Sequence, residues 1–167
     1  MPFTGAAEFR VAGVDERPAL QHMLELYQYE LSDIWDQDLD ASGEYGYALD
    51  RYWSSPESRP FVATVAGRYA GFALADHAVK VAESGNWMDQ FFVLKKYRRA
   101  GVGLRLAHAV FDAIPGYWEV GQMPANVPAQ RFWRRVIGEY TGGAFVEHVV
   151  TSGWWQGVVQ SFTSGSP

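Results

Sequence analysis

The sequence predicts an α/β protein of the α+β kind, with elements in the order β-α-α-β-β-β-α-β-α-β-β. Short runs rich in β-branched and aromatic residues, typical of strands, are followed by longer runs whose apolar residues recur at helical spacing. A basic turn with two glycines joins one strand run to one helix run. The length of 167 residues suffices for one hydrophobic core. We therefore expect one domain over residues 1–162 and a frayed tail at residues 163–167.

The first predicted elements are a strand and two helices. Apolar and polar residues alternate over residues 8–12, as in a short strand. Asp15 is a candidate helix cap, and apolar residues recur at helical spacing over residues 16–34. We expect a second helix over residues 45–53, before the turn-forming residues 54–56.

The middle of the chain is predicted to contain three strands and a helix. Residues 61–65 and 69–75 are β-rich runs separated by a short glycine turn, which predicts a hairpin. Residues 86–94 form the predicted central strand. The helix that begins after Gly101 should end at Ile114, because a Pro-Gly pair follows and cannot continue it.

The last predicted elements are a strand, a helix and a pair of strands. Residues 117–121 form the strand, and Asn126 caps a helix that runs to about residue 140. Residues 144–150 and 154–162 are β-rich and predict a terminal β-pair.

Composition excludes several classes of function. The chain has no cysteine, so disulfides, thiol nucleophiles and thiolate metal sites are excluded. Its four histidines lack metal-ligand spacing, and we expect no metal site. No apolar run approaches the ~18 residues of a membrane span, the N-terminus lacks signal-peptide features, and the net charge of −5 weighs against nucleic-acid binding. We expect a cytoplasmic monomer or homodimer with no membrane or nucleic-acid partner.

The basic glycine turn predicts an anion site. It follows the apolar run Phe91-Phe92-Val93 and opens a helix. A helix start offers unpaired backbone N–H groups and positive dipole charge, and glycine lets the backbone approach a pyrophosphate closely. Five basic side chains add positive charge, namely Lys95, Lys96, Arg98, Arg99 and Arg105. The alternative is an ordinary strand-to-helix turn with solvated arginines.

Two ordered motifs resemble those of the Gcn5-related N-acetyltransferase (GNAT) family. The spacing Arg98-x-x-Gly101-x-Gly103 is similar to that family's (Gln or Arg)-x-x-Gly-x-(Gly or Ala) signature. Further along, Asn126-x-x-Ala129-x-x-Phe132-Trp133 is similar to its Asn-x-x-Ala-x-x-Phe-Tyr helix start, with Trp133 where the family often has Tyr. With the elements around them, these motifs extend the resemblance over nearly the whole chain.

The resemblance implies a fold and a cofactor. The expected sheet is mixed and mostly antiparallel, with about four helices, and its two middle strands splay apart at 91–93 and 118–120. The strand at 91–93 is expected to pair with the pantetheine of acetyl-CoA through its free backbone edge. Asn126 has an alternative as a plain helix cap. The expected acetyl-CoA contacts are Phe91, Phe92, Val93, Arg98, Arg99, Ala100, Gly101, Val102, Gly103, Asn126, Ala129, Phe132 and Trp133.

The same resemblance implies an N-acetyltransferase. The acetyl group of acetyl-CoA would pass to a primary amine of a small-molecule or peptide acceptor by direct attack on the thioester. The alternative is a catalytically silent acetyl-CoA sensor or interaction domain. A P-loop enzyme is disfavoured, because Leu104-Arg105 follows the second glycine where that motif needs Lys-(Ser or Thr).

Direct attack needs a base to deprotonate the amine. Asp89 lies within an apolar strand and is the first candidate, and Glu119 on the neighbouring strand is the second. The two-residue period of a strand places Asp89 on the face of Phe91, and Met88 on the face of Phe92. The alternative is that either acid is merely paired or solvated.

The proton donor for the departing thiolate is left open by this sequence. Trp133 occupies the family's usual tyrosine place, and an indole N–H is no useful proton source. Tyr140 or Tyr97 could serve instead, or the thiolate could leave unassisted.

The acceptor side is predicted from charge. Residues 21–50 contain eight acids and no Lys or Arg. Oppositely charged surfaces would draw anionic acetyl-CoA and a cationic amine to different places. We expect Tyr27, Asp36, Asp38 and Tyr45 to contact a cationic acceptor. The alternative is a solvated acidic loop.

Overall fold

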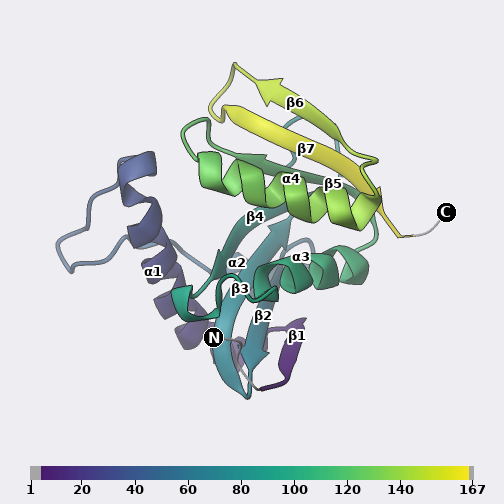
Figure 1. The fold of residues 1–167 in the computed structure, drawn as a ribbon. Coiled ribbons are helices and arrows are strands. Elements are labelled where there is room, and N and C mark those ends of the chain that lie inside the picture. The colour runs from purple at the N-terminus through teal and green to yellow at the C-terminus, as the bar shows by residue number, and fades with distance from the viewer. Residues whose placement is uncertain (1–4, 166–167) are drawn as a thin grey trace.

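The computed structural model describes residues 5–165 of the chain. These residues form a seven-stranded sheet with helices packed against it (Figure 1). Its strands are β1 (Ala7–Val11), β2 (Arg59–Val65), β3 (Arg68–Asp76), β4 (Asn86–Val93), β5 (Gly116–Gln122), β6 (Val146–Val150) and β7 (Gly157–Ser164). The spatial order is β1-β2-β3-β4-β5-β7-β6, and only β4 and β5 pair in parallel. The predicted order of elements and the mixed, mostly antiparallel sheet are confirmed.

Four α-helices lie in the described residues: α1 (Arg17–Trp35), α2 (Arg51–Ser54), α3 (Val102–Ala113) and α4 (Val127–Thr141). Short 3-10 helices precede α1 (Val14–Glu16) and α3 (Lys95–Tyr97). The Asn126 side chain caps α4 by accepting a hydrogen bond from the backbone of Ala129 (3.4 Å). The helix cap predicted at Asn126 is therefore present.

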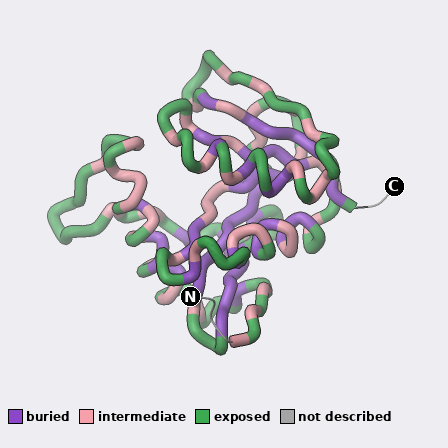
Figure 2. The backbone as a smooth tube through the Cα atoms, in the orientation of Figure 1, coloured by how far each residue is buried: buried purple, intermediate pink, exposed green. Residues whose placement is uncertain are grey.

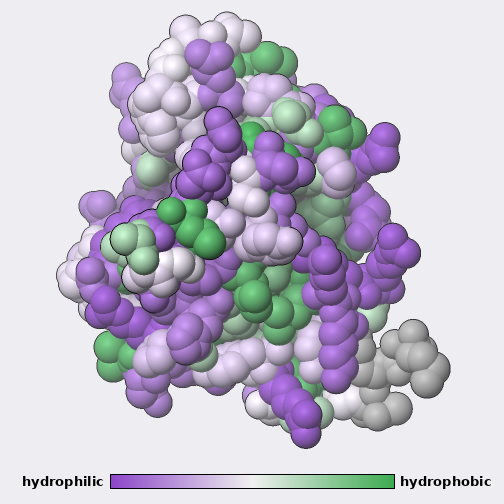
Figure 3. All heavy atoms as spheres, turned by 90° about the vertical axis from the view of Figure 1, so that its left-hand side faces the viewer, coloured by the Kyte–Doolittle hydropathy of each residue, from purple (hydrophilic) through white to green (hydrophobic). Residues whose placement is uncertain are grey.

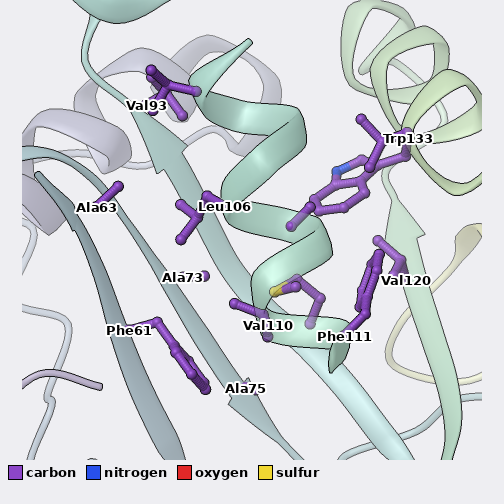
Figure 4. Packing of buried hydrophobic residues seen from close by; sticks show 14 of the residues in the cluster. Phe61, Ala63, Ala73, Ala75, Val93, Leu106, Val110, Phe111, Val120 and Trp133 are labelled. Carbon is purple, nitrogen blue, oxygen red and sulfur yellow. The ribbon is translucent and has the colours of Figure 1, made fainter. Parts of the chain in front are cut away.

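Helices cover both faces of the sheet, and alternate residues of the strands form two cores. Phe61 and Ala63 of β2 join the core under α3 and α4, whereas Val62 between them joins the core under α1 and α2. Figure 4 shows the first core, with Leu106 of α3 facing the strands. The central strands are the most continuously buried part of the chain (Figure 2).

The two middle strands separate after a short parallel pairing. β4 pairs with β5 only at Asn86 with Trp118 and at Trp87 with Glu119. From Met88 onward, β4 has β3 on one side and no described strand on the other. This confirms the expected splay, although Trp118 and Glu119 are still paired, so the separation on β5 begins at Val120, two residues later than expected.

A β-bulge at Asp89 overturns the predicted facing of β4. Leu74 pairs with Gln90 and Ala75 pairs with Met88, so Asp89 is an extra residue between them. Met88 therefore packs in the core under α3 and α4, while Phe92 packs in the core under α1 and α2. The two-residue period fails here because an inserted residue reverses the alternation.

Several predicted boundaries differ from the structure. The helix expected over residues 45–53 is reduced to α2, because Gly46 has a φ of +77° and the amides of Tyr45 and Gly46 donate to the carboxylate of Glu25. Asp15 lies inside a 3-10 helix and does not cap α1. In the tail expected at 163–167, residues 163 and 164 belong to β7, and residues 166–167 lie outside the described part.

Candidate functional site

A cavity of about 820 Å³ opens where β4 and β5 separate. It extends from the start of α3, along the free edge of β4, to the C-terminal half of α1 and the loop before β7. The side of the molecule that carries α1 shows hydrophobic residues gathered among hydrophilic ones (Figure 3). The lining residues give the cavity a basic end, an apolar middle and a far end with several aromatic rings and the carboxylate of Asp89.

The basic end is formed by the turn into α3. Arg99 and Gly101 have left-handed φ angles of +64° and +80°, and Gly101 forms the N-cap of the helix. A Cβ on Gly101 would meet nothing within 4 Å, so open space lies over its backbone. A Cβ on Gly103 would meet the ring of Phe132 at 3.1 Å. The first-turn amides of α3 have no intrahelical acceptor and can bind an anion.

Arg98 is held by protein groups at this end. Its guanidinium donates two hydrogen bonds of 2.7 Å to the carboxylate of Glu30, and its Nε donates to the carbonyl of Val93 (2.7 Å). The side chain thus ties the turn to α1 and to the end of β4. Arg98, Arg99, Gly101 and Gly103 line the cavity, whereas the predicted contacts Ala100 and Val102 do not. Val102 instead packs in the core.

The apolar middle is an aromatic wall from β4 and α4. The ring of Phe91 lies 4.7 Å from that of Trp133 and 5.7 Å from that of Phe132. Such aromatic pairs contribute about 0.5–1.5 kcal/mol each beyond area burial. The predicted contacts Phe92, Val93, Asn126 and Ala129 also line the cavity. The wall faces the edge of β4 whose backbone groups have no strand partner.

Asp89 lies at the far end in a network of donors. Its Oδ2 accepts hydrogen bonds from the hydroxyls of Tyr47 (2.6 Å) and Tyr52 (2.7 Å) and from Arg51 (2.9 Å). Burial first, and then the charge of Asp89, raises the pKa of both tyrosines, so they stay protonated and donate. Arg51 also binds Asp76 (2.8 Å), whose pKa is raised by burial and by repulsion from Asp89. The bulge thus turns Asp89 toward α2, away from Phe91.

Glu119 is fully buried at the point where the strands separate. Its carboxylate accepts hydrogen bonds from the backbone amides of Lys80 (2.6 Å), Val81 (3.0 Å) and Ala82 (2.7 Å) and from the hydroxyl of Tyr117 (2.8 Å). Burial opposes the charged form, but these four donors outweigh it and hold the pKa of Glu119 below its ordinary value. Glu119 does not line the cavity, and it anchors the loop between β3 and β4.

Other predicted residues are divided between cavity and surface. Tyr27 lines the cavity, and burial raises the pKa of its hydroxyl. Tyr140 lies outside the lining, where its hydroxyl donates to Asp112 (2.7 Å) and burial together with that bond raises its pKa to about 12. Asp36, Asp38 and Tyr45 also lie outside the lining. Only the acid Glu30 brings the segment 21–50 into contact with the cavity through a carboxylate.

Sequence reasoning missed an aromatic group at the far end. Trp87 and Trp155 meet edge to face at 5.5 Å, and Trp154 stands beside them. The Nζ of Lys80 lies 3.8 Å from the ring centre of Trp87. All four residues line the cavity. The high tryptophan content was the only signal in the sequence, because these residues come from three separate segments.

Other kinds of site find no support in the described residues. Over residues 5–165, no three His, Cys, Asp or Glu side chains are arranged to hold a metal ion. None of the helices in this part of the chain is both long and apolar enough to cross a membrane. The cavity as a whole offers anion-binding amides, a free strand edge, an apolar wall and a carboxylate held at its far end.

Comparison with known proteins identifies the same architecture. The sequence matches the model of the acetyltransferase (GNAT) family over residues 20–138. No curated protein matches the sequence. The fold is similar to that of an acetyltransferase from Thermus thermophilus, with 15% identity, a TM-score of 0.66, and coverage of 95% of this chain and 97% of that one.

Two further solved structures are similar over similar lengths. The aminoglycoside acetyltransferase AAC(6')-Ib in complex with coenzyme A has 16% identity and a TM-score of 0.65, with 95% of each chain covered. The ribosomal-protein-S18-alanine N-acetyltransferase from Escherichia coli has 14% identity and a TM-score of 0.64, with 97% of this chain and 96% of that one covered. At such identities the likeness shows the fold alone.

Proposed function

The chain belongs to the GNAT acetyltransferase family, and we propose that it transfers the acetyl group of acetyl-CoA to a primary amine of a cationic small molecule or peptide. One observation carries this proposal. A single cavity joins the start of α3, the free edge of β4 and the carboxylate of Asp89. The amine would attack the thioester directly, because both reactants can meet in that one space.

The residues of this cavity fit acetyl-CoA. The first-turn amides of α3 and the open space over Gly101 suit its pyrophosphate. The unpaired edge of β4 can hydrogen-bond the amide groups of pantetheine as an added strand would. Phe91, Phe132 and Trp133 provide an apolar wall beside that edge. Acetyl-CoA supplies the thioester, and a similar fold is found with coenzyme A in the aminoglycoside enzyme.

Asp89 is the proposed base. It lies on the same strand as the expected pantetheine contacts and lines the cavity. Among the described residues all three of its donors bind Oδ2, which leaves Oδ1 to accept a proton from the amine, directly or through water. Glu119 is not part of the proposal, because four donors occupy its buried carboxylate.

The proposal includes no general acid. Tyr140 is engaged with Asp112 outside the cavity, and the indole of Trp133 serves as a wall. A thiol has an ordinary pKa of about 8.5, so a thiolate is a tolerable leaving group near neutral pH. The protein therefore needs only to position the thioester and to remove the amine proton.

A cationic acceptor fits the far end of the cavity. The carboxylate of Asp89 would attract an ammonium group, whereas the ring of Trp87 already has the Nζ of Lys80 over it. Solved structures of similar fold include enzymes whose titles name an aminoglycoside and a protein alanine as acceptors, so the fold alone does not select one.

The second candidate is an acetyl-CoA-binding protein without turnover. It is favoured by the contacts of Asp89, because Arg51 and the hydroxyls of Tyr47 and Tyr52 already occupy Oδ2 of this carboxylate. Two measurements separate the candidates. Isothermal titration with acetyl-CoA should give saturable binding under both, and release of free thiol in the presence of amines, polyamines, amino acids or aminoglycosides should occur only if the protein is a transferase. Absence of binding would contradict both.

A further inference from the structure

Lys80 is an amine that the chain itself places in the cavity. The lysines of the sequence are Lys80, Lys95 and Lys96, and Lys80 alone of these lines the cavity in the described part. Lys95 and Lys96 belong to the 3-10 helix before α3, at the basic end. The family resemblance gives no role to this lysine, and its position needs a separate explanation.

The backbone around Lys80 is held in place by the carboxylate of Glu119. The amides of Lys80, Val81 and Ala82 all donate to the buried carboxylate of Glu119. Charge-assisted hydrogen bonds of this kind are roughly twice as strong as neutral ones. Because Glu119 pairs with Trp87 in the last parallel pairing of β4 and β5, the loop is anchored at the point where the strands separate.

The head of the Lys80 side chain lies beside the indoles of Trp87, Trp154 and Trp155, which we call the indole box, and Trp154 forms its exposed side. Its Nζ is 3.8 Å from the ring centre of Trp87, 5.4 Å from Trp154 and 5.9 Å from Trp155, and it donates to the carbonyl of Ala78. A Cβ on Gly121 would lie 2.4 Å from Trp87 and 2.8 Å from Trp155, so the missing side chain makes room for two of the indoles. The box therefore depends on specific packing.

The box lies where the thioester is expected. A pantetheine arm that starts at the α3 turn and follows β4 from Val93 to Met88 would advance about 16 Å, which is five steps of roughly 3.3 Å each. That distance is comparable with an extended pantetheine arm. Its sulfur would then come next to Trp87 and Asp89, which precede and follow Met88 in β4 and both line the cavity.

The environment of the amine shifts its equilibrium toward the neutral, nucleophilic form. Burial lowers the pKa of Lys80, and this outweighs the opposite effect of the carboxylates of Asp76, Asp89 and Glu119. A larger fraction of this amine than of a fully solvated lysine is therefore able to attack a thioester near neutral pH.

We propose that Lys80 is a built-in acceptor, so that the chain acetylates its own Nζ from acetyl-CoA held in the same cavity. This proposal rests on the proposed acetyl-CoA-dependent function. The neutral Nζ forms a bond to the acetyl carbonyl carbon, and the carbon–sulfur bond breaks to release CoA thiolate. The proton lost by nitrogen passes to Asp89 or water and from there to solvent, and CoA leaves as the thiolate. The product is N-acetyl-lysine, which has no positive charge to hold over Trp87.

The first test uses the full chain and acetyl-CoA without any acceptor, with peptide mapping by mass spectrometry. Lys80 should gain one acetyl group at least about tenfold faster than Lys95 or Lys96, since proximity makes the step effectively unimolecular. Its first-order rate should stay constant when the protein is diluted, whereas a rate that rises with protein concentration would overturn self-acetylation within one chain.

Two variants are matched controls. Lys80→Arg keeps a cation near the tryptophans but removes the nucleophile, and it should remove the fast acetylation without raising that of the other lysines. Gly101→Val, which is expected to weaken acetyl-CoA binding, should slow acetylation of Lys80 by acetyl-CoA, while acetic anhydride should still modify it. If acetylation of Lys80 is slowed equally with both reagents, the substitution acts on the surroundings of Lys80 and not on bound acetyl-CoA. That result would overturn the role of bound acetyl-CoA.

A second readout needs no acetyl-CoA. The pH at which acetic anhydride half-modifies Lys80 in a fixed time should be lower in the native protein than in the same chain unfolded in urea. If the protein acetylates an added amine but Lys80 is acetylated no faster than Lys95, this inference is overturned and the proposed function still stands. Absence of acetyl-CoA binding would overturn both.

Discussion

The two ends of the cavity are built in opposite ways. The basic end comes from one stretch of chain, in which Val93, Arg98 and Gly101 follow one another closely and backbone geometry shapes the site. The far end combines Asp89 with Trp155 and with Lys80, and side chains from separate segments shape it. Changes at the basic end should therefore act mainly on cofactor binding, and changes at the far end mainly on catalysis and on loop stability.

Asp89→Asn should have the largest effect. If Asp89 is the base, turnover should fall by about 10² to 10⁴, the usual range for removing a general base. Acetyl-CoA affinity should stay the same, because the carboxylate lies at the far end from the α3 turn. Steady-state kinetics with an amine found by the thiol-release screen, together with isothermal titration, measure the two quantities.

Tyr52→Phe is the matched control for Asp89→Asn. It removes one of three hydrogen bonds to Oδ2 and leaves the carboxylate in place, so turnover should change far less. Full activity of Asp89→Asn would contradict the assignment, and deprotonation would then come from water or from the amine's own equilibrium.

Glu119→Gln should reduce stability by roughly 3 kcal/mol at pH 7, because it breaks a buried, charged hydrogen-bond network. The pKa of Glu119 is lowered in the folded protein. Its charged form therefore stabilises the fold fully above the pKa of the unfolded chain, about 4.3, and this stabilisation is lost as the pH falls through the pKa of the folded protein. Urea unfolding should thus show a difference in the free energy of unfolding between wild type and variant, and this difference should become smaller below about pH 4. A difference that does not depend on pH would mean that Glu119 acts through packing.

Gly101→Val should weaken acetyl-CoA binding tenfold or more, about 1.4 kcal/mol. A branched side chain would fill the open space over the turn, and a φ of +80° is strained for any residue with a Cβ. Gly142→Val is the matched control, because Gly142 has a φ of +63°, also meets nothing within 4 Å, and lies outside the cavity lining. An equal loss of affinity in both variants would point to general destabilisation.

The contrast between the two ends also explains what could be predicted from the sequence. The turn from β4 into α3 and the start of α4 depend on neighbours in the chain, so the sequence could predict the role of Gly101 in the turn and of Asn126 as the cap of α4. The bulge at Asp89 depends on the register with β3, and no local pattern in β4 reports it. The helix expected over residues 45–53 was prevented by Glu25, an acid twenty residues away from Tyr45. Contacts between residues far apart in the sequence determine the structure of the far end.

The smallest effect is expected from replacing Asp36 and Asp38 together with Asn, although the sequence suggested that they contact the acceptor. Neither residue lines the cavity, and Asp36 ends α1 in a left-handed conformation that Asn also tolerates. Both carboxylates are exposed, and salt screens exposed charges at physiological ionic strength, so the Michaelis constant for a cationic amine should change less than about twofold. Measurements at low salt give the more sensitive comparison, because screening weakens there. A severalfold increase at physiological salt, with the constant for acetyl-CoA unchanged, would show that this acidic segment reaches the acceptor after all.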